Sequence, residues 1–301
     1  MRYATAPAFR TALEARLLAH SQATGLSLNR LRKQVVFERI LARLLVVAPD
    51  RWILKGGFAL DLRLGTHARP TRDVDLSRHD DVEHATADMV AAQSTDVGDY
   101  FQFVVERTEA LDDLLEGAAV RYRVNACLAG RRFEQVVVDI GFGDPFLQEP
   151  DMLSGTGLLE FADVQSPRVP AIPLTQHVAE KVHAYARMYG QMGRPSTRVK
   201  DLVDLVLIGT YESFQAADLE RALEATFGAR STQKLPSSLP SPPPEWRVPY
   251  ARLAKDLPID DDVTEAYLFA SKFLDPVLGR TMAASAMWDP GRSNWLSSRL
   301  A

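Results

Sequence analysis

The sequence predicts an α+β fold, in which residues 1–165 form a mixed β-sheet with flanking helices and residues 166–301 form an all-helical lobe. Two observations lead to this prediction. A strand, a Gly-Gly turn, a helix and a second strand follow one another over residues 52–77, and β-branched runs continue to residue 141. From Pro173 onward, apolar residues recur at helical spacing instead.

The first elements can be justified from local chemistry. Two amphipathic helices are expected over residues 8–22 and 28–47, followed by a short apolar strand at 52–54. Apolar residues over 58–64 suit a buried helix, which the following glycine ends. Pro70 then keeps the chain extended into a strand over 71–77, because the residue before a proline avoids the helical conformation.

The remaining elements are predicted from helical spacing of apolar residues and from β-branched runs. A helix is expected over residues 80–93, and three strands near 101–107, 119–128 and 132–141. The second lobe is expected to contain only helices, over residues 175–189, 197–209, 216–227, 247–256 and 261–278. The Ser- and Pro-rich stretch 231–244, which separates the expected helices 216–227 and 247–256, is expected to be extended.

Composition limits the class of protein. A chain of 301 residues with 46% hydrophobic content can bury one large core or two smaller ones. Cys127 is the single cysteine, which excludes a disulfide framework and favours a reducing cytoplasm. The apolar run over residues 44–48 is far too short to cross a bilayer. We therefore expect a cytoplasmic monomer that does not associate with membranes.

The most informative pattern is Lys55 with Gly56 and Gly57, followed after fifteen residues by Asp73 and Asp75. Two glycines at the start of a helix let bare backbone N–H groups approach a phosphate. Two aspartates one residue apart on a strand point to the same side and can share a divalent metal ion. Either pattern alone is commonly a turn or a solvated strand end, but the two joined by one short helix indicate nucleotidyl transfer.

A third carboxylate is available in the strand expected at 132–141. Asp139 interrupts a β-branched run near its end, and a charge inside such a run is either paired or functional. Asp139 is therefore either a third metal ligand or a buried ion-pair partner, and the first interpretation is favoured. Glu134, at the start of the strand, is the weaker candidate.

The net charge of −4 conceals an uneven distribution, because residues 1–80 carry 14 Lys and Arg against 7 Asp and Glu. A protein that is basic along one face can hold an RNA backbone, whereas the alternative is an ordinary solvated helix surface. The basic residues concerned are Arg30, Arg32, Lys33, Arg39 and Arg43 on one helix, and Arg63, Arg69, Arg72 and Arg78 around the Asp73 and Asp75 motif.

Taken together, the motifs resemble the AbiEii/MenT group of nucleotidyltransferase toxins from type IV toxin–antitoxin systems, within the polymerase-beta-like superfamily. The resemblance is carried by the Lys-Gly-Gly turn, the Asp-x-Asp strand and the segments 176–187 and 198–205, and it continues through 239–246 and 273–278. It therefore covers nearly the whole chain. One departure is Phe58, which follows the glycines where many relatives have a small hydroxyl residue.

The resemblance implies a metal-dependent enzyme that transfers a nucleoside monophosphate from a nucleoside triphosphate. Mg²⁺ is the expected cofactor, with Mn²⁺ as a substitute, and the 3′ end of tRNA is the expected acceptor. A cognate antitoxin from a neighbouring gene is the expected protein partner. The expected catalytic residues are Lys55, Asp73, Asp75, Lys181 and Asp204, the expected nucleotide ligands are Gly56, Gly57, Arg72 and Lys181, and the expected metal ligands are Asp73, Asp75 and Asp139.

Several alternatives stay open at this point. Asp204 orients either Lys181 or the nucleotide, and Asp201 competes for the same role. Lys181 is either a second phosphate clamp or an ordinary surface lysine on an amphipathic helix. The acceptor is RNA, or else a protein or small molecule. A non-catalytic nucleotide- or RNA-binding module is disfavoured, because clustered carboxylates cost stability unless a metal ion binds.

Overall fold

The computed structural model describes residues 1–108, 119–143, 148–189, 194–195 and 198–297, and the chain divides into two compact units. Unit 1 consists of Met1–Thr66, Pro70–Asp144 and Pro150–Ile172. Unit 2 consists of His67–Arg69, Pro145–Glu149 and Pro173–Ala301. Each unit has its own secondary structure, so each is described by itself.

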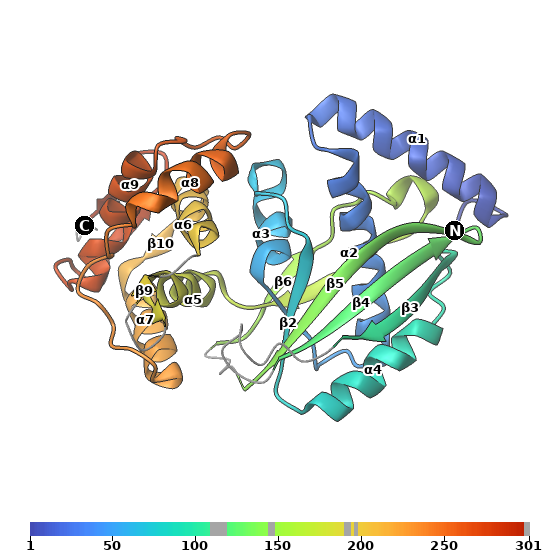
Figure 1. Ribbon diagram of the computed structural model, residues 1–301, viewed down its shortest axis with the longest axis horizontal. Coiled ribbons are helices and arrows are strands. Elements are labelled where there is room, and N and C mark those ends of the chain that lie inside the picture. Colours follow the sequence, from blue (N-terminus) through green and yellow to red (C-terminus); the bar gives the residue numbers. More distant parts are fainter. Residues whose placement is uncertain (109–118, 144–147, 190–193, 196–197, 298–301) are drawn as a thin grey trace. The chain divides into compact units, whose positions relative to one another are not determined.

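Unit 1 is built on a seven-stranded mixed sheet in the order β3-β4-β5-β2-β1-β7-β6 (Figure 1). Strands β2 and β5 are parallel, as are β1 and β7, and the other neighbouring pairs are antiparallel. The strands are β1 (Ile53–Lys55), β2 (Asp73–Arg78), β3 (Phe101–Arg107), β4 (Ala119–Leu128), β5 (Arg131–Phe142), β6 (Asp151–Ser154) and β7 (Arg168–Ala171).

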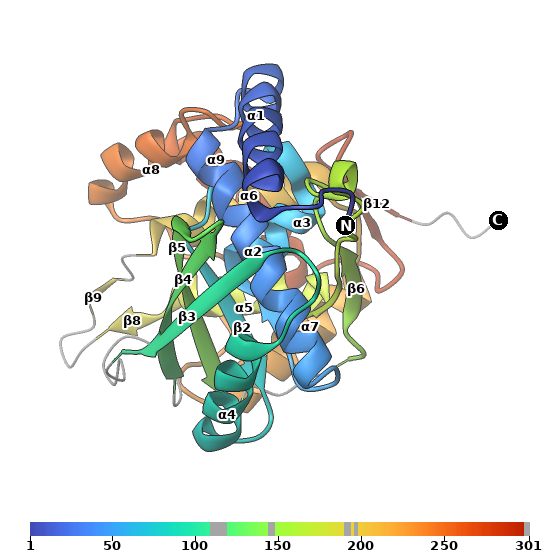
Figure 2. The ribbon, with the colours of Figure 1, turned by 90° about the vertical axis from the view of Figure 1, so that its right-hand side faces the viewer.

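The helices of unit 1 are α1 (Ala6–Thr24), α2 (Leu28–Val47), α3 (Gly56–Leu64) and α4 (Val82–Ser94). Polar side chains fix where three of them begin. Thr5, Ser27 and Asp81 each accept a hydrogen bond from a backbone N–H in the first turn of α1, α2 and α4 respectively. In Figures 1 and 2, α4 lies beside β3, which it contacts.

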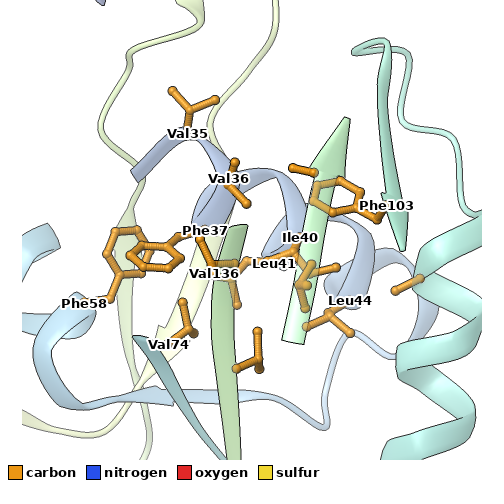
Figure 3. Packing of buried hydrophobic residues seen from close by; sticks show 14 of the residues in the cluster. Val35, Val36, Phe37, Ile40, Leu41, Leu44, Phe58, Val74, Phe103 and Val136 are labelled. Carbon is orange, nitrogen blue, oxygen red and sulfur yellow. The ribbon is translucent and has the colours of Figure 1, made fainter. Parts of the chain in front are cut away.

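The core of unit 1 lies between α2 and one face of the sheet. Figure 3 shows Phe37, Ile40 and Leu41 of α2 packed near Val74 of β2 and Val136 of β5. All five side chains are at most 1% exposed. Because side chains alternate along a strand, burial of these β2 and β5 positions sends the intervening residues of both strands to the opposite face.

Unit 2 is mostly helical but also contains strands. Its helices are α5 (Leu174–Ala186), α6 (Val199–Tyr211), α7 (Ala216–Arg230), α8 (Arg247–Ala254) and α9 (Val263–Leu278), and its strands are β8 (Met188–Tyr189), β9 (Arg194–Pro195), β10 (Phe214–Gln215), β11 (Met287–Asp289) and β12 (Asn294–Leu296). Strands β10, β11 and β12 form one small sheet, and β8 pairs with β9. The expected all-helical lobe is therefore not confirmed.

Tertiary contacts explain why the sequence does not predict the small sheet. Trp288 of β11 and Trp295 of β12 both pack on Phe273 of α9, at ring-centroid distances of 4.9 and 6.2 Å. Their indole N–H groups donate to the backbone carbonyls of Gly209 and Phe273. Strands of two or three residues are too short to carry a periodic signal, so packing on α9 defines them.

Most of the other predicted elements are confirmed within a few residues. Strands β6 and β7 are additions to the expected elements, and β7 extends the main sheet beside β1. Helix α5 ends at Ala186 rather than at 189, because Arg187 has an extended backbone with φ −71° and ψ 134°. Within the described ranges, no helix is both long enough and apolar enough to cross a membrane.

Candidate functional site

Four charged residues form a row across β1, β2, β5 and β4 of unit 1. Strand register pairs Lys55 with Asp75, Asp75 with Asp139, and Asp139 with Arg121. Directly opposed residues in a sheet project to the same face, and here that face is opposite the core. The sheet therefore brings together three of the residues expected from the sequence and adds one cation, Arg121. We call these four residues the charge row.

Asp73 lies beside the charge row. It is two residues before Asp75 on β2, so both carboxylates project from the same face of the sheet. The hydroxyl of Thr71 donates a hydrogen bond to Asp73 Oδ1 at 2.9 Å. Both aspartates are half-buried, which leaves part of each side chain accessible.

The third carboxylate, Asp139, is a buried ion-pair partner. Arg121 donates from Nε to Asp139 Oδ1 and from Nη2 to Oδ2, both at 2.7 Å. The hydrogen bond with Asp139 raises the pKa of Arg121, and the charges of Asp73 and Asp75 raise it further. The sequence shows Arg121 only as an outward position in an alternating strand, and its partner is defined by the register of β4 on β5.

The carboxylates suit a divalent metal ion to different degrees. Asp73 and Asp75 supply hard oxygen donors from one face, and Mg²⁺ is commonly bound through one or two carboxylates together with substrate phosphates. Asp139 differs, because both of its oxygens already accept from Arg121. In the described part of the chain, no group of three or more His, Cys, Asp or Glu lies close enough together to hold a metal ion. A three-carboxylate site stays a prediction.

The Gly-Gly turn forms the start of α3, as the sequence predicts. Lys55 occupies the position before the first helical residue, and Gly56 and Gly57 are the first two residues of the helix. The first backbone N–H groups of a helix have no partner within it and can bind an anion. Gly56 has a φ of +63°, and a Cβ atom there would stand 1.8 Å from Asp75 Oδ2. Glycine is therefore required where the turn passes the carboxylate.

Phe58, the departure from the family pattern, belongs to the core. Its side chain is fully buried, and its ring centroid lies 4.9 Å from that of Phe37 on α2. A residue in this position cannot supply a hydroxyl group to a phosphate. Recognition of a phosphate at the start of α3 therefore depends on backbone N–H groups and on other side chains.

In unit 2, five charged residues form a network that joins α5 and α6 to residue 69. Asp204 accepts from Lys181 Nζ at 2.5 Å and, through both oxygens, from Arg69 at 2.7 and 2.9 Å. Lys181 also contacts Asp201 at 3.4 Å, and Asp201 accepts from Arg198 at 2.7 Å. Positive and negative groups thus alternate from Arg69 to Arg198. We call these five residues the ion-pair network.

The ion-pair network shows what Asp204 contacts. Its side chain is fully buried, and Lys181 is only 6% exposed, so Lys181 is not an ordinary surface lysine. Burial alone would raise the pKa of Asp204, but the charges of Arg69 and Lys181 outweigh it and hold that pKa well below its ordinary value. Asp204 and, at a longer distance, Asp201 both hold Lys181, and a role of Asp204 in orienting the nucleotide stays a prediction. The sequence does not identify Arg69 as a partner of Asp204.

Most of the basic residues proposed to track RNA are engaged inside the protein. Arg30 pairs with Asp61, Arg63 with Asp151, Arg78 with Asp80 and Asp88, and both Arg39 and Arg43 with Asp99. Arg30, Arg39, Arg43 and Arg78 are buried, so the expectation that they contact RNA is wrong. Arg72 is exposed and keeps its expected role as a prediction.

The fold of this chain is similar to that of known proteins. The structure is similar to MenT4, a nucleotidyltransferase toxin from Mycobacterium tuberculosis, with a TM-score of 0.58 and 18% identity over 93% of this chain and 92% of that one. This likeness shows a shared fold. JHP933 from Helicobacter pylori matches with a TM-score of 0.43 and 14% identity, over 83% of this chain and 93% of that one. No curated protein matches the sequence.

The sequence itself establishes the family. A family profile described as nucleotidyl transferase AbiEii toxin of a type IV toxin–antitoxin system matches residues 39–271. This range includes the charge row, Asp73 and the ion-pair network. The chain therefore belongs to the AbiEii family of nucleotidyltransferase toxins.

Proposed function

We propose that this nucleotidyltransferase uses Mg²⁺, for which Mn²⁺ can substitute, to transfer a nucleoside monophosphate from a nucleoside triphosphate to the 3′-terminal hydroxyl of tRNA. The observation that carries the proposal is the charge row with Asp73 beside it, next to the Gly-Gly start of α3. Carboxylates that can hold a cation and the first turn of a helix, whose N–H groups can bind a phosphate, occur together at this place.

At phosphorus, the reaction forms one bond and breaks another. The RNA hydroxyl loses its proton to solvent and attacks the α-phosphorus, the bond from that phosphorus to the oxygen shared with the β-phosphorus breaks, and pyrophosphate leaves. Asp73 and Asp75 would hold the cation, which when bound neutralises charge that develops on the phosphate oxygens. The first N–H groups of α3, at Gly56 and Gly57, bind a phosphate of the triphosphate, and Lys55 adds a positive charge beside them.

Lys181 is proposed to act in the same reaction, as a second clamp on the triphosphate. The family match supports this role, because its range includes both Lys181 and Asp204. Within unit 2, Asp204 and Asp201 fix the position of the Lys181 ammonium group. A compact ammonium makes a point-charge contact with phosphate, which a planar guanidinium does not reproduce.

Chemistry also favours a tRNA end as the acceptor. A tRNA 3′ end is single-stranded, so its terminal hydroxyl and bases are accessible without opening a duplex. Extending that end blocks aminoacylation, which accounts for toxicity through arrested translation in the cytoplasm. The family implies an antitoxin as partner. We propose that a neighbouring gene encodes it and that the toxin acts as a monomer.

The proposal is tested by incubating the purified protein with total RNA, a protein extract and each α-labelled nucleoside triphosphate in turn, in Mg²⁺. We expect label on RNA of tRNA length with at least one nucleotide. Purified tRNA whose terminal diol has been oxidised with periodate should stay unlabelled, because it lacks the attacking hydroxyl. Asp73→Asn and Asp75→Asn should each lower labelling by roughly 10²–10³-fold, as expected when a group that stabilises transition-state charge is lost.

One control variant and two contrary outcomes separate the possible results. Asp50→Asn changes an exposed aspartate of unit 1 and should leave labelling unchanged. Full labelling by Asp73→Asn would contradict the proposed chemistry. Label that enters protein or small molecules, with no RNA labelled under any nucleotide, would keep the chemistry but contradict tRNA as the acceptor.

A further inference from the structure

Each of the two oxygens of Asp139 accepts a hydrogen bond from the same guanidinium group. The contact is side-on, from Nε and Nη2 of Arg121, with both distances at 2.7 Å. The side chain of Asp139 is 8% exposed and that of Arg121 is 35% exposed. Bidentate pairs of this kind are strong and fix the orientation of the carboxylate plane. Asp139 is thus held in one orientation by a residue on the neighbouring strand.

This arrangement conflicts with direct metal ligation by Asp139. To bind a cation at short range, Asp139 would have to use the remaining lone pair of an oxygen that already accepts from Arg121. The cation would then lie close to a guanidinium that stays positively charged. The positive charges of the guanidinium and the cation would repel each other at this short distance. The pair and a metal ion therefore compete for the same two oxygens.

The charges of the site are consistent with a cation held by two carboxylates. Within the charge row, Lys55 and Arg121 are at the two ends, and Asp75 and Asp139 lie between them. Asp73 adds one more negative charge beside the row, on the same strand as Asp75. Asp73 and Asp75 together carry two negative charges, enough for a divalent ion that also binds substrate phosphates.

We propose that Arg121 is a positioning residue that holds Asp139 out of the coordination sphere, so that the divalent cation is bound by Asp73 and Asp75. This inference rests on the proposed function, because it concerns the same site. It replaces the expected three-carboxylate site with a two-carboxylate site beside a fixed ion pair. Arg121 also keeps a positive charge close to the carboxylates, where it lowers the affinity for the cation.

The test measures Mn²⁺ binding to the full chain without RNA, by electron paramagnetic resonance of free Mn²⁺, so it does not depend on turnover. The decisive variant combines Arg121→Gln with Asp139→Asn, because it removes the pair without changing the net charge. We expect its Mn²⁺ affinity to stay within about threefold of the wild type. Asp75→Asn should lower the affinity by about tenfold or more, as for the loss of a ligand.

A single substitution provides a second readout. Arg121→Gln alone should raise Mn²⁺ affinity by about tenfold, because it removes a nearby positive charge and frees Asp139 to bind. The matched control is Arg123→Gln, which makes the same change two residues further along β4. The side chain of Arg123 is 51% exposed, and its ion pair with Glu106 is long, at 3.7 Å. The affinity of this control for Mn²⁺ should match the wild type.

The outcomes separate this inference from the proposed function. A double variant that loses as much Mn²⁺ affinity as Asp75→Asn would show that Asp139 is a ligand and overturn the inference, even if tRNA is still labelled. A wild type that binds no Mn²⁺ would overturn both proposals. If the double variant does not fold, Arg121→Met with Asp139→Leu gives the same test, since apolar replacement of a buried pair is often neutral.

Discussion

The carboxylate of Asp75 lies directly over the backbone of Gly56, in the space that any other residue would fill with its Cβ atom. The two residues belong to different elements, β2 and the first turn of α3. One glycine therefore serves two purposes, because it allows a left-handed turn and leaves room for a candidate metal ligand.

Gly56→Ala should combine a stability loss with a functional loss. An alanine at φ +63° costs roughly 1–2 kcal/mol of unfolding free energy, and its Cβ displaces the Asp75 carboxylate. We expect nucleotidyl transfer to fall by roughly 10²-fold, the scale of a misplacement of about 1 Å. Gly25→Ala is the control, since Gly25 has a φ of +76° and an added Cβ there would meet no atom within 4 Å. If both variants lose activity equally, displacement of Asp75 is not the cause.

The ion-pair network predicts an order of stabilities in unit 2. Asp204→Asn leaves Lys181 and Arg69 without their shared buried carboxylate, and should lower the unfolding free energy by roughly 3–5 kcal/mol. Lys181→Met should cost less, because Asp204 keeps both hydrogen bonds from Arg69. Urea unfolding of the three proteins measures the order. The reverse order would mean that Arg69 does not compensate Asp204.

Lys181 can be tested for function separately from stability. Lys181→Arg keeps a positive charge in the network but replaces a compact ammonium with a planar fork. We expect it to stay folded, to bind Mn²⁺ like the wild type and to recover little of the activity that Lys181→Met loses. Wild-type nucleotide binding and turnover in Lys181→Met would show that this lysine is only structural.

The lowered pKa of His183 is expected to make the stability of the protein depend on pH. Burial, together with the charge of Arg230, lowers the pKa of His183 from 6.5 to about 4. Between these two pH values the unfolded chain binds a proton at His183 that the folded chain does not. The unfolding free energy therefore decreases as the pH falls from 6.5 to about 4, and His183 does not lower it above pH 6.5. Its slope is at most about 1.4 kcal/mol per pH unit. Urea unfolding across this window should show a smaller slope for His183→Gln, and an unchanged slope would contradict the shift.

Substitution of Arg72 tests whether this residue, close to β2, binds RNA or the nucleotide. If it binds RNA phosphate, Arg72→Gln should reduce the slope of log affinity against log salt by about 1. If it binds the triphosphate, the KM for nucleotide should rise and the salt slope for RNA should stay the same. Arg252→Gln, at an exposed position on α8, is the control for loss of one surface charge. A variant unchanged in both measurements would assign Arg72 no role in binding.

Local sequence chemistry is sufficient for a large part of the fold and of the site. It predicts the start of α3 at Gly56, the strand with Asp73 and Asp75, and most helix positions, because turns, caps and periodicity depend on near neighbours in the chain. The same local reasoning assigns Arg30 and Arg78 to an RNA surface, although both are buried in ion pairs. Residue type alone does not show on which side of an element a long charged side chain finds its partner.

The sequence by itself determined the family and the candidate site residues, because the types and spacing of these residues form short motifs that identify the family. Only the tertiary structure decided their partners. Arg121 and Asp139 are 18 residues apart and meet through strand register, while Arg69 and Asp204 are 135 residues apart and meet through packing within unit 2. No local pattern encodes such pairings, because they depend on contacts that exist only after the sheet and the helices have assembled.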